Sequence, residues 1–158
     1  MITLRSSRAD EATEIAKVHV QADWETYSPI FGTKARRVDL AVSQARWASA
    51  LNAGDVLLVA IEDDRIIGLG HARNDWMSAL YLLASHRRRG IGARLLSELR
   101  RRLGGRGVET FGFQVVAANH DAIAFYEAQG ARRLGSRMEG AGEDAWEDYI
   151  YEIATLRR

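Results

Sequence analysis

The 158-residue chain contains no cysteine. This absence excludes disulfide bonds, thiolate metal sites and a cysteine nucleophile, and it fits a reducing environment. Proline is nearly absent as well, because Pro29 is the only one, and no Ser- or Gly-rich tract marks a flexible linker. We therefore expect residues 1–158 to form a single domain, long enough to bury a substantial core.

Long apolar runs and an excess of charge of one sign are also missing. Residues 1–5 lead directly into a strand-like segment without a signal-peptide pattern, and no apolar stretch is long enough for a transmembrane helix. With 22 basic and 21 acidic residues, the chain has no overall field that favours nucleic acid or a membrane surface. The four histidines lack metal-ligand spacing. We expect a cytoplasmic protein without a metal and without nucleic-acid or membrane partners.

The most informative stretch is LYLLASHRRRGIGARLL, residues 80–96. It predicts an apolar strand, a basic turn and an amphipathic helix. Gly90 and Gly92 let the backbone approach a ligand closely, and the helix that follows directs its free N–H groups and positive dipole end at the turn. The stretch therefore predicts a site for a phosphorylated ligand. It is neither a Walker A loop nor a G-x-G-x-x-G dinucleotide loop, and the remaining alternative is an ordinary turn with a solvated arginine run.

Hydrophobic periodicity predicts an α/β fold with a mixed sheet and the element order β-α-α-β-β-β-α-β-α-β-β. Strands are expected at 2–5, 56–61, 66–72, 76–83, 108–116, 131–138 and 146–154, and helices at 9–22, 38–51, 90–103 and 119–129. The strands on either side of the third helix should be parallel neighbours. Ser6 or Ser7 is the expected cap of the first helix. The aromatic segment 24–31 is interpreted as an irregular passage between two helices that fills the core and contributes a substrate wall.

Two spaced patterns carry a family resemblance. Arg87-x-x-Gly90-x-Gly92 resembles motif A of the GCN5-related N-acetyltransferase (GNAT) family. The pattern N-x-x-A-x-x-F-Y-E-x-x-G, residues 119–130, is similar to motif B of that family, with Ala131 in place of the usual final Phe. Taken alone, Asn119 would be interpreted as a helix cap and Tyr126 as a core residue.

The resemblance implies a single N-acetyltransferase domain with the acyl-CoA N-acyltransferase fold and with acetyl-CoA as cosubstrate. In this family the strand backbone pairs with the pantetheine arm, and one N–H of that strand faces the thioester carbonyl. A tyrosine then protonates the departing thiolate, for which a phenol is a weak but usable acid. The implied catalytic residues are Tyr126 and Leu82, and the implied cofactor-binding residues are Leu80, Tyr81, Leu82, Arg87, Arg88, Arg89, Gly90, Ile91, Gly92, Ala93, Asn119 and Tyr126.

The general base is not identified by the resemblance. Some family members place a Glu where this chain has Gln114, and others place one where it has Trp76. Asp75, His71 and Glu25 stay as candidates, either directly or through water.

The sequence therefore predicts an enzyme that moves an acetyl group directly to a primary amine of a small molecule or an amino acid. Trp24, Tyr27, Phe31 and Asp75 are the candidate acceptor-site residues. Two alternatives stay open: an acetyltransferase acting on proteins or peptides, and a non-catalytic module that binds coenzyme A. Glu143, Asp144, Glu147 and Asp148 could attract a basic peptide, although we interpret them as a solvated hairpin. A homodimer is compatible with the resemblance.

Overall fold

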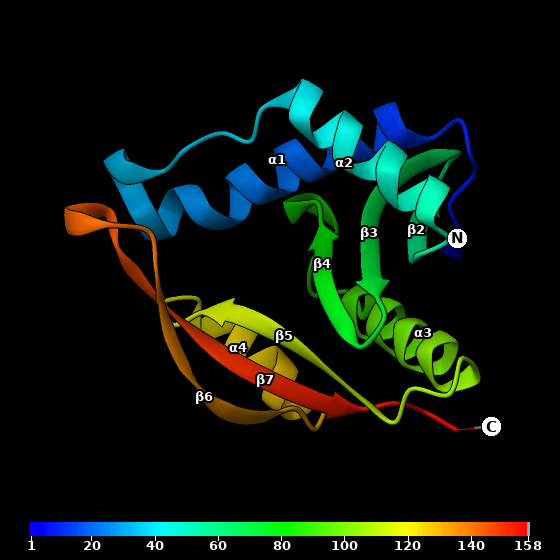
Figure 1. The fold of residues 1–158 in the computed structure, drawn as a ribbon. Coiled ribbons are helices and arrows are strands. Elements are labelled where there is room, and N and C mark those ends of the chain that lie inside the picture. Colours follow the sequence, from blue (N-terminus) through cyan, green and yellow to red (C-terminus); the bar gives the residue numbers. More distant parts are fainter. Residues whose placement is uncertain (158) are drawn as a thin grey trace.

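Strands β1 to β4 form an antiparallel meander, which is one side of a seven-stranded sheet in the computed structural model (Figure 1). The structure describes residues 1–157. The sheet order is β1-β2-β3-β4-β5-β7-β6, so that β7 lies between β5 and β6. The strands are β1 (Thr3–Ser6), β2 (Val56–Glu62), β3 (Arg65–Arg73), β4 (Trp76–Leu82), β5 (Thr110–Val116), β6 (Arg132–Glu139) and β7 (Trp146–Ala154).

Helices cover both faces of this sheet and create two cores. Helices α1 (Ala12–Phe31) and α2 (Leu40–Ala53) pack on one face, where Trp47 is fully buried with Leu57 and Val59 of β2. Helix α3 (Ile91–Gly105) lies on the other face with α4 (His120–Ala128), and its apolar stripe packs against Leu58 of β2 and the aromatic residues of β5 and β7. Because both faces are covered, β2 is a continuous apolar run rather than an alternating one.

The predicted fold class and element order are confirmed, and so is the interpretation of Asn119 as a helix cap; the two ends of α2 are also set by capping residues. Asp39 caps α2 by accepting a hydrogen bond from the Val42 N–H, and Gly54 ends that helix in the left-handed conformation. Asn119 caps α4 through its bond from the Ala122 N–H. Short 3-10 turns that were not predicted occur as η1 (Gly32–Lys34), η2 (Ala84–His86) and η3 (Gly142–Asp144).

The first helix differs from the prediction at both ends. Neither serine caps it. Ser6 belongs to β1 and pairs with Leu58 of β2, and the helix begins after Glu11. The predicted irregular passage is wrong as well, because the segment continues α1 as far as Phe31. Pro29 is the third residue from the end of α1, and its missing N–H removes one helical bond. Helical spacing also brings the Tyr27 and Phe31 rings to 6.0 Å between centroids, a packing that favours the extra turns.

Strands β4 and β5 are parallel, as predicted, but they pair at only one register position, Trp76 opposite Gly112. The Gly112 N–H also donates to the carbonyl of Asp75 at 2.9 Å. Beyond this point the two strands share no further ladder position in the described residues, and Figure 1 shows them running at an angle to each other. The sheet is therefore pinned at the start of β4 and open towards its end. None of the helices in residues 1–157 combines the length and the apolar character that crossing a membrane requires.

Candidate active site

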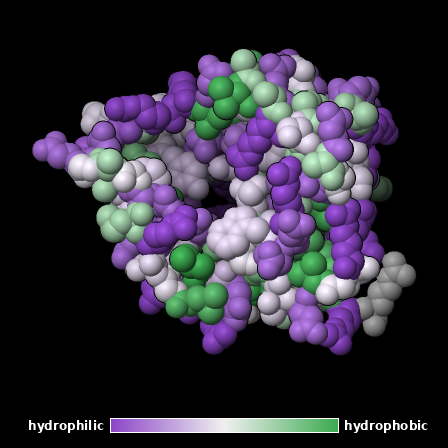
Figure 2. Space-filling view, viewed as in Figure 1, coloured by the Kyte–Doolittle hydropathy of each residue, from purple (hydrophilic) through white to green (hydrophobic). Residues whose placement is uncertain are grey.

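The open end of β4 offers main-chain donors to whatever lies beside it. Leu83 donates to the carbonyl of Ile67 at 3.0 Å. From there to His71 the register between β3 and β4 does not shift, and it places Tyr81 opposite Leu69. In an antiparallel ladder the paired and unpaired positions alternate, so the N–H groups of Leu80 and Leu82 point away from β3. They face the side from which β5 has diverged. Figure 2 shows the surface hollowed at this place, between the α1–β4 side and the β5–β7 side.

The loop after β4 presents a second set of free donors. Six consecutive N–H groups, from Arg88 through Ala93, donate to no acceptor within the described residues, and the first bond of α3 is Arg94 N–H to the Gly90 carbonyl at 3.2 Å. Left-handed φ angles at Arg88 (60°) and Gly90 (77°) turn this backbone into a concave shape. Such a nest at a helix N-terminus attracts an anion. Gly90 is required by its φ angle, whereas a Cβ on Gly92 would only touch the Phe125 ring at 3.7 Å.

The three loop arginines take different roles. Arg87 turns back to bind the Leu82 carbonyl at 3.1 Å and the Thr26 hydroxyl of α1 at 2.9 Å, so it braces the strand end. Arg89 pairs with Glu62 at 2.9 Å, and its guanidinium, together with His86, holds the pKa of that carboxyl below its usual value. The Arg88 side chain has no polar partner within residues 1–157.

Tyr126 of α4 faces the same region from the other side of the sheet. Its ring packs 4.5 Å from Phe113 and 5.1 Å from Phe125, and the residue is 8% exposed. Its hydroxyl has no hydrogen-bond partner among the described residues. Every fully buried side-chain polar atom there has a partner, so this hydroxyl is not fully buried. Burial, with a smaller contribution from Tyr27, raises the pKa of Tyr126 above its usual range. The hydroxyl therefore stays protonated at neutral pH as a hydrogen-bond donor, although it is a poorer acid than a free phenol.

Asn119 is positioned by the cap of α4. Its Oδ1 accepts from the Ala122 N–H at 3.2 Å, so only its amide NH2 group is left for a ligand. The cap was the simpler of the two roles considered for this residue.

The aromatic residues of α1, Trp24, Tyr27 and Phe31, share one side of the helix by their spacing. Phe31 packs edge-on against Trp146 of β7 at 5.7 Å, while the Trp24 ring carries the Arg37 guanidinium at 4.0 Å. Burial, followed by the negative charges of Asp23 and Asp148, raises the pKa of Tyr27 to about 12. Tyr27 thus lies within electrostatic reach of α4, α1 and β7 at once.

Asp148, which the sequence singled out only as part of an acidic run that could attract a basic peptide, is a functional candidate in its own right. It is only 9% exposed, so the interpretation of residues 143–148 as a wholly solvated hairpin is wrong for this position. Asp148 Oδ1 accepts from the Trp146 indole at 2.9 Å, and Oδ2 accepts from the Gln114 amide at 3.3 Å. Strand alternation could have placed it on one face of β7. Its contact with Gln114 of β5, 34 residues away, is one that no local pattern contains.

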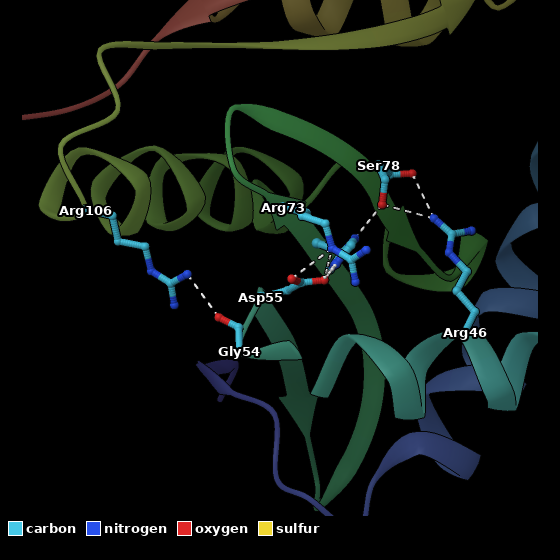
Figure 3. A network of polar contacts seen from close by, with 7 residues as sticks. Arg46, Gly54, Asp55, Arg73, Ser78 and Arg106 are labelled. Carbon is cyan, nitrogen blue, oxygen red and sulfur yellow. Dashed lines mark hydrogen bonds and ion pairs between the residues drawn. The ribbon is translucent and has the colours of Figure 1, made fainter. Parts of the chain in front are cut away.

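The candidate bases named from the sequence lie elsewhere or are already engaged. Asp75 is at the pinned start of β4, a whole strand away from Leu82. Glu25 accepts from the Ala84 N–H at 3.1 Å and so anchors η2. His71 bridges Ser78 and Asp55 in a polar network that also includes Arg73 and Arg46 (Figure 3).

This network ties elements together rather than forming an open site. Asp55 Oδ2 lies 2.7 Å from His71 Nε2, and Arg73 Nε donates to the same carboxylate at 3.0 Å. In the same view Arg106, the residue after α3, donates to the Gly54 carbonyl at 3.0 Å. Within residues 1–157 no group of three or more His, Asp or Glu side chains has the arrangement of a metal site.

The far side of the hollow is closed by contacts between distant segments. Lys34 of η1 donates to the Glu143 carbonyl at 2.6 Å and lies 3.9 Å from the Asp144 carboxylate. Figure 1 shows the β6–β7 turn beside the end of α1 at this place. The chain's own lysine therefore compensates part of the acidic turn.

Comparisons with known proteins agree with this geometry. A family model described as "Acetyltransferase (GNAT) family" matches residues 18–131. No curated protein sequence matches the chain.

Similar solved structures include yncA, a putative acetyltransferase from Salmonella typhimurium with its cofactor acetyl-CoA, with 18% identity, coverage of 100% and 96% of the two chains and a TM-score of 0.78. A GNAT superfamily phosphinothricin acetyltransferase from Sinorhizobium meliloti in complex with acetyl-CoA has 22% identity, coverage of 98% and 88%, and a TM-score of 0.75. A ribosomal-protein-alanine N-acetyltransferase from Brucella melitensis has 20% identity, coverage of 96% and 99%, and a TM-score of 0.77.

Proposed function

The chain belongs to the GNAT acetyltransferase family, and on this premise we propose that it moves the acetyl group of acetyl-CoA directly to the primary amine of a small molecule. The same proposal treats residues 1–158 as one acetyltransferase domain. Two parts of the structure support the cosubstrate, and one contact supports the class of acceptor.

The loop from Arg88 to Ala93 fits the diphosphate of acetyl-CoA. It offers six unused N–H donors in a concave backbone at the start of α3, where the helix dipole favours negative charge. Arg88 supplies positive charge at the rim, Arg89 shares its charge with Glu62, and Arg87 holds the loop to the end of β4. In this assignment Asn119 contributes its free amide to the pantetheine arm.

The open edge of β4 fits the rest of the cosubstrate. The N–H groups of Leu80 and Leu82 face the opening, so the amides of a pantetheine arm can add there as a short extra strand. The Leu82 N–H is then the donor for the oxygen of the tetrahedral intermediate. Tyr81 contributes backbone alignment, since its hydroxyl is bound to Asp23 at 3.1 Å.

The chemistry requires no enzyme nucleophile. The acceptor nitrogen attacks the thioester carbonyl, a C–N bond forms, and the C–S bond breaks to release the thiolate of coenzyme A. Tyr126 donates a hydrogen bond to that sulfur, whose conjugate thiol has a pKa of about 8.5. The ammonium form of the amine loses one proton before the attack. The proton that it loses after the attack ends on the sulfur through this hydroxyl.

The observation that favours a small acceptor over a peptide is the bridge between Lys34 and the β6–β7 turn. A peptide needs an open groove between the amino-terminal helices and the last hairpin. Here Lys34 contacts Glu143 and Asp144, and Phe31 contacts Trp146 across the same gap. Tyr27, Phe31 and Trp24 then form an aromatic wall for a small amine. Asp75, at the pinned end of β4, is left out of this acceptor site.

Thiol release tests the proposal. The purified full chain is incubated with acetyl-CoA and one acceptor at a time. The acceptors are small primary amines, amino acids, and peptides bearing a free α-amine or a lysine. We expect binding of coenzyme A in calorimetry and release of free thiol with small amines. Release with peptides alone would overturn the acceptor class. Binding without release by any acceptor would overturn the proposed transfer and favour a non-catalytic module.

A further inference from the structure

Asp148 is a buried carboxylate whose hydrogen-bond partners are all neutral. The Trp146 indole and the Gln114 amide bind its two oxygens, and no cation forms an ion pair with it in residues 1–157. Burying a carboxylate without a cation is costly, and neutral hydrogen bonds compensate only part of that cost. The side chain therefore has capacity to bind a positively charged group.

Charged groups near Asp148 do not fill that role. From β6, Arg137 is opposite Asp148 in the ladder, and its charge lowers the pKa of that carboxyl. The guanidinium, however, is paired with Glu139 at 2.6 Å and donates to the Gln114 side-chain oxygen at 3.3 Å, and the charge of Glu139 raises the pKa of Asp148. From β5, Gln114 is neutral, and from α1, Tyr27 stays protonated at neutral pH because its pKa is raised to about 12. Burial is the main cause that raises the pKa of Asp148, with Glu139 adding to it.

The position of Asp148 coincides with the open end of the sheet. It is paired with Val116, the last residue of β5, whereas the pinned contact of β5 with β4 is at Gly112. Its charge acts on Tyr27, and Tyr27 in turn acts on Tyr126. Strand alternation puts Asp148 on the face of β7 that Trp146 presents to Phe31 of α1, opposite to the Phe113 face on which Tyr126 packs. The carboxylate therefore approaches the opening from the α1 side, and Tyr126 approaches it from the α4 side.

Building on the proposed function, we propose that Asp148 binds the ammonium group of the acceptor amine and takes the proton that must leave before the nitrogen can attack. The step is balanced: R–NH3⁺ transfers one proton to the Asp148 carboxylate and becomes a neutral amine. The amine then attacks the thioester, and its second proton ends on the sulfur of coenzyme A. Asp148 finally releases its proton to solvent. Gln114 and Trp146 act as positioning residues that hold the carboxylate.

The variant Asp148→Asn tests this role, because it keeps the shape and a hydrogen-bonding oxygen but cannot accept the proton. Kinetics use acetyl-CoA and the panel amine that the unaltered chain acetylates fastest. We expect kcat/KM for the amine at pH 7 to fall by about 100-fold or more, in the range of a lost general base. The acidic limb of the pH profile should disappear, and the affinity for coenzyme A should stay within about twofold.

Glu147→Gln is the matched control, since this neighbouring carboxylate is exposed, and we expect it to leave kcat/KM and the pH profile unchanged. An Asp148→Asn chain with full activity and the same pH profile would overturn the inference while leaving the proposed function intact. Equal loss of coenzyme A affinity would also overturn it, by indicating a structural role. If the unaltered chain acetylates no amine, the proposed function fails first.

Discussion

The indole ring of Trp76 lies directly over Gly112, so close that a Cβ on this glycine would be 2.7 Å from Cζ3 and 2.9 Å from Cε3 of the ring. These two residues are also the one register pair between β4 and β5. The contact is thus the pivot from which the two strands diverge, and the proposed thioester site lies beyond it.

Replacing Gly112 with Ala should destabilise the pivot. The new methyl group would force the ring aside, and overpacking of this kind costs about 1–3 kcal/mol. Urea unfolding measures the loss. Gly135→Ala in β6 is the control, because nothing lies within 4 Å of its Cβ position. When the ring is already removed by Trp76→Ala, adding Gly112→Ala should not lower the free energy of unfolding further. If Gly112→Ala costs the same free energy with and without the Trp76 ring, the explanation is contradicted.

Gly90→Ala should weaken binding of acetyl-CoA. Gly90 has a φ of 77° with open space around it, so the cost is backbone strain of about 1–2 kcal/mol rather than a clash. Because relaxing that strain distorts the row of N–H donors, we expect KM for acetyl-CoA to rise by about tenfold. Steady-state kinetics and calorimetry with coenzyme A measure this. Gly105→Ala, at the other end of α3, should leave KM unchanged; equal KM values for both variants would argue against the assigned loop.

Tyr126→Phe separates catalysis from stability. The ring contacts with Phe113 and Phe125 are kept, and the hydroxyl has no partner to lose in the described residues, so the free energy of unfolding should change by less than about 0.5 kcal/mol. The variant lacks the donor to the leaving sulfur, and kcat should fall by about 100-fold. Retained kcat would remove Tyr126 from the mechanism, and Tyr149→Phe, in β7, serves as a control for the loss of a phenol.

His19 should make folding stability depend on pH. Burial lowers its pKa from 6.5 to about 4, and its Nδ1 receives the Trp47 indole N–H at 3.3 Å and lies 2.8 Å from the Ser43 hydroxyl. Between pH 6.5 and 4 the unfolded chain binds a proton that the folded chain does not, so stability falls as the pH is lowered. From pH 7.5 to 5 this residue should account for about 2 kcal/mol.

Urea unfolding at the two pH values of this His19 prediction measures the loss. His19→Asn, whose side-chain oxygen can accept in place of Nδ1, should remove that share of the pH dependence. His120→Gln, at an exposed position, should not change it. A pH dependence identical in the His19→Asn and unaltered chains would refute the assignment.

Much of the fold could be predicted because the signals were local. The glycines and arginines of residues 87–92 indicated the anion-binding loop, and the free N–H groups from Arg88 to Ala93 follow from a helix start after a left-handed residue. Asn119, Asp39 and Gly54 acted at the helix ends as their side chains and φ preferences indicate. Pro29 misled the prediction of α1, because a proline close to a helix end costs one bond and aromatic packing outweighed it.

The sequence by itself determined the order of elements, the glycine loop whose N–H groups are free at the start of α3, and the face of each strand on which a side chain lies. These depend on periods of 2 and 3.6 residues and on the conformational preferences of single residues. Only the tertiary structure decided where β4 and β5 part and which carboxylate of the last hairpin is buried. The end of α1 and the turn after it meet that hairpin through Phe31 and Trp146 and through Lys34 and Glu143. Contact between segments more than 100 residues apart follows from how the layers pack, which no local pattern contains.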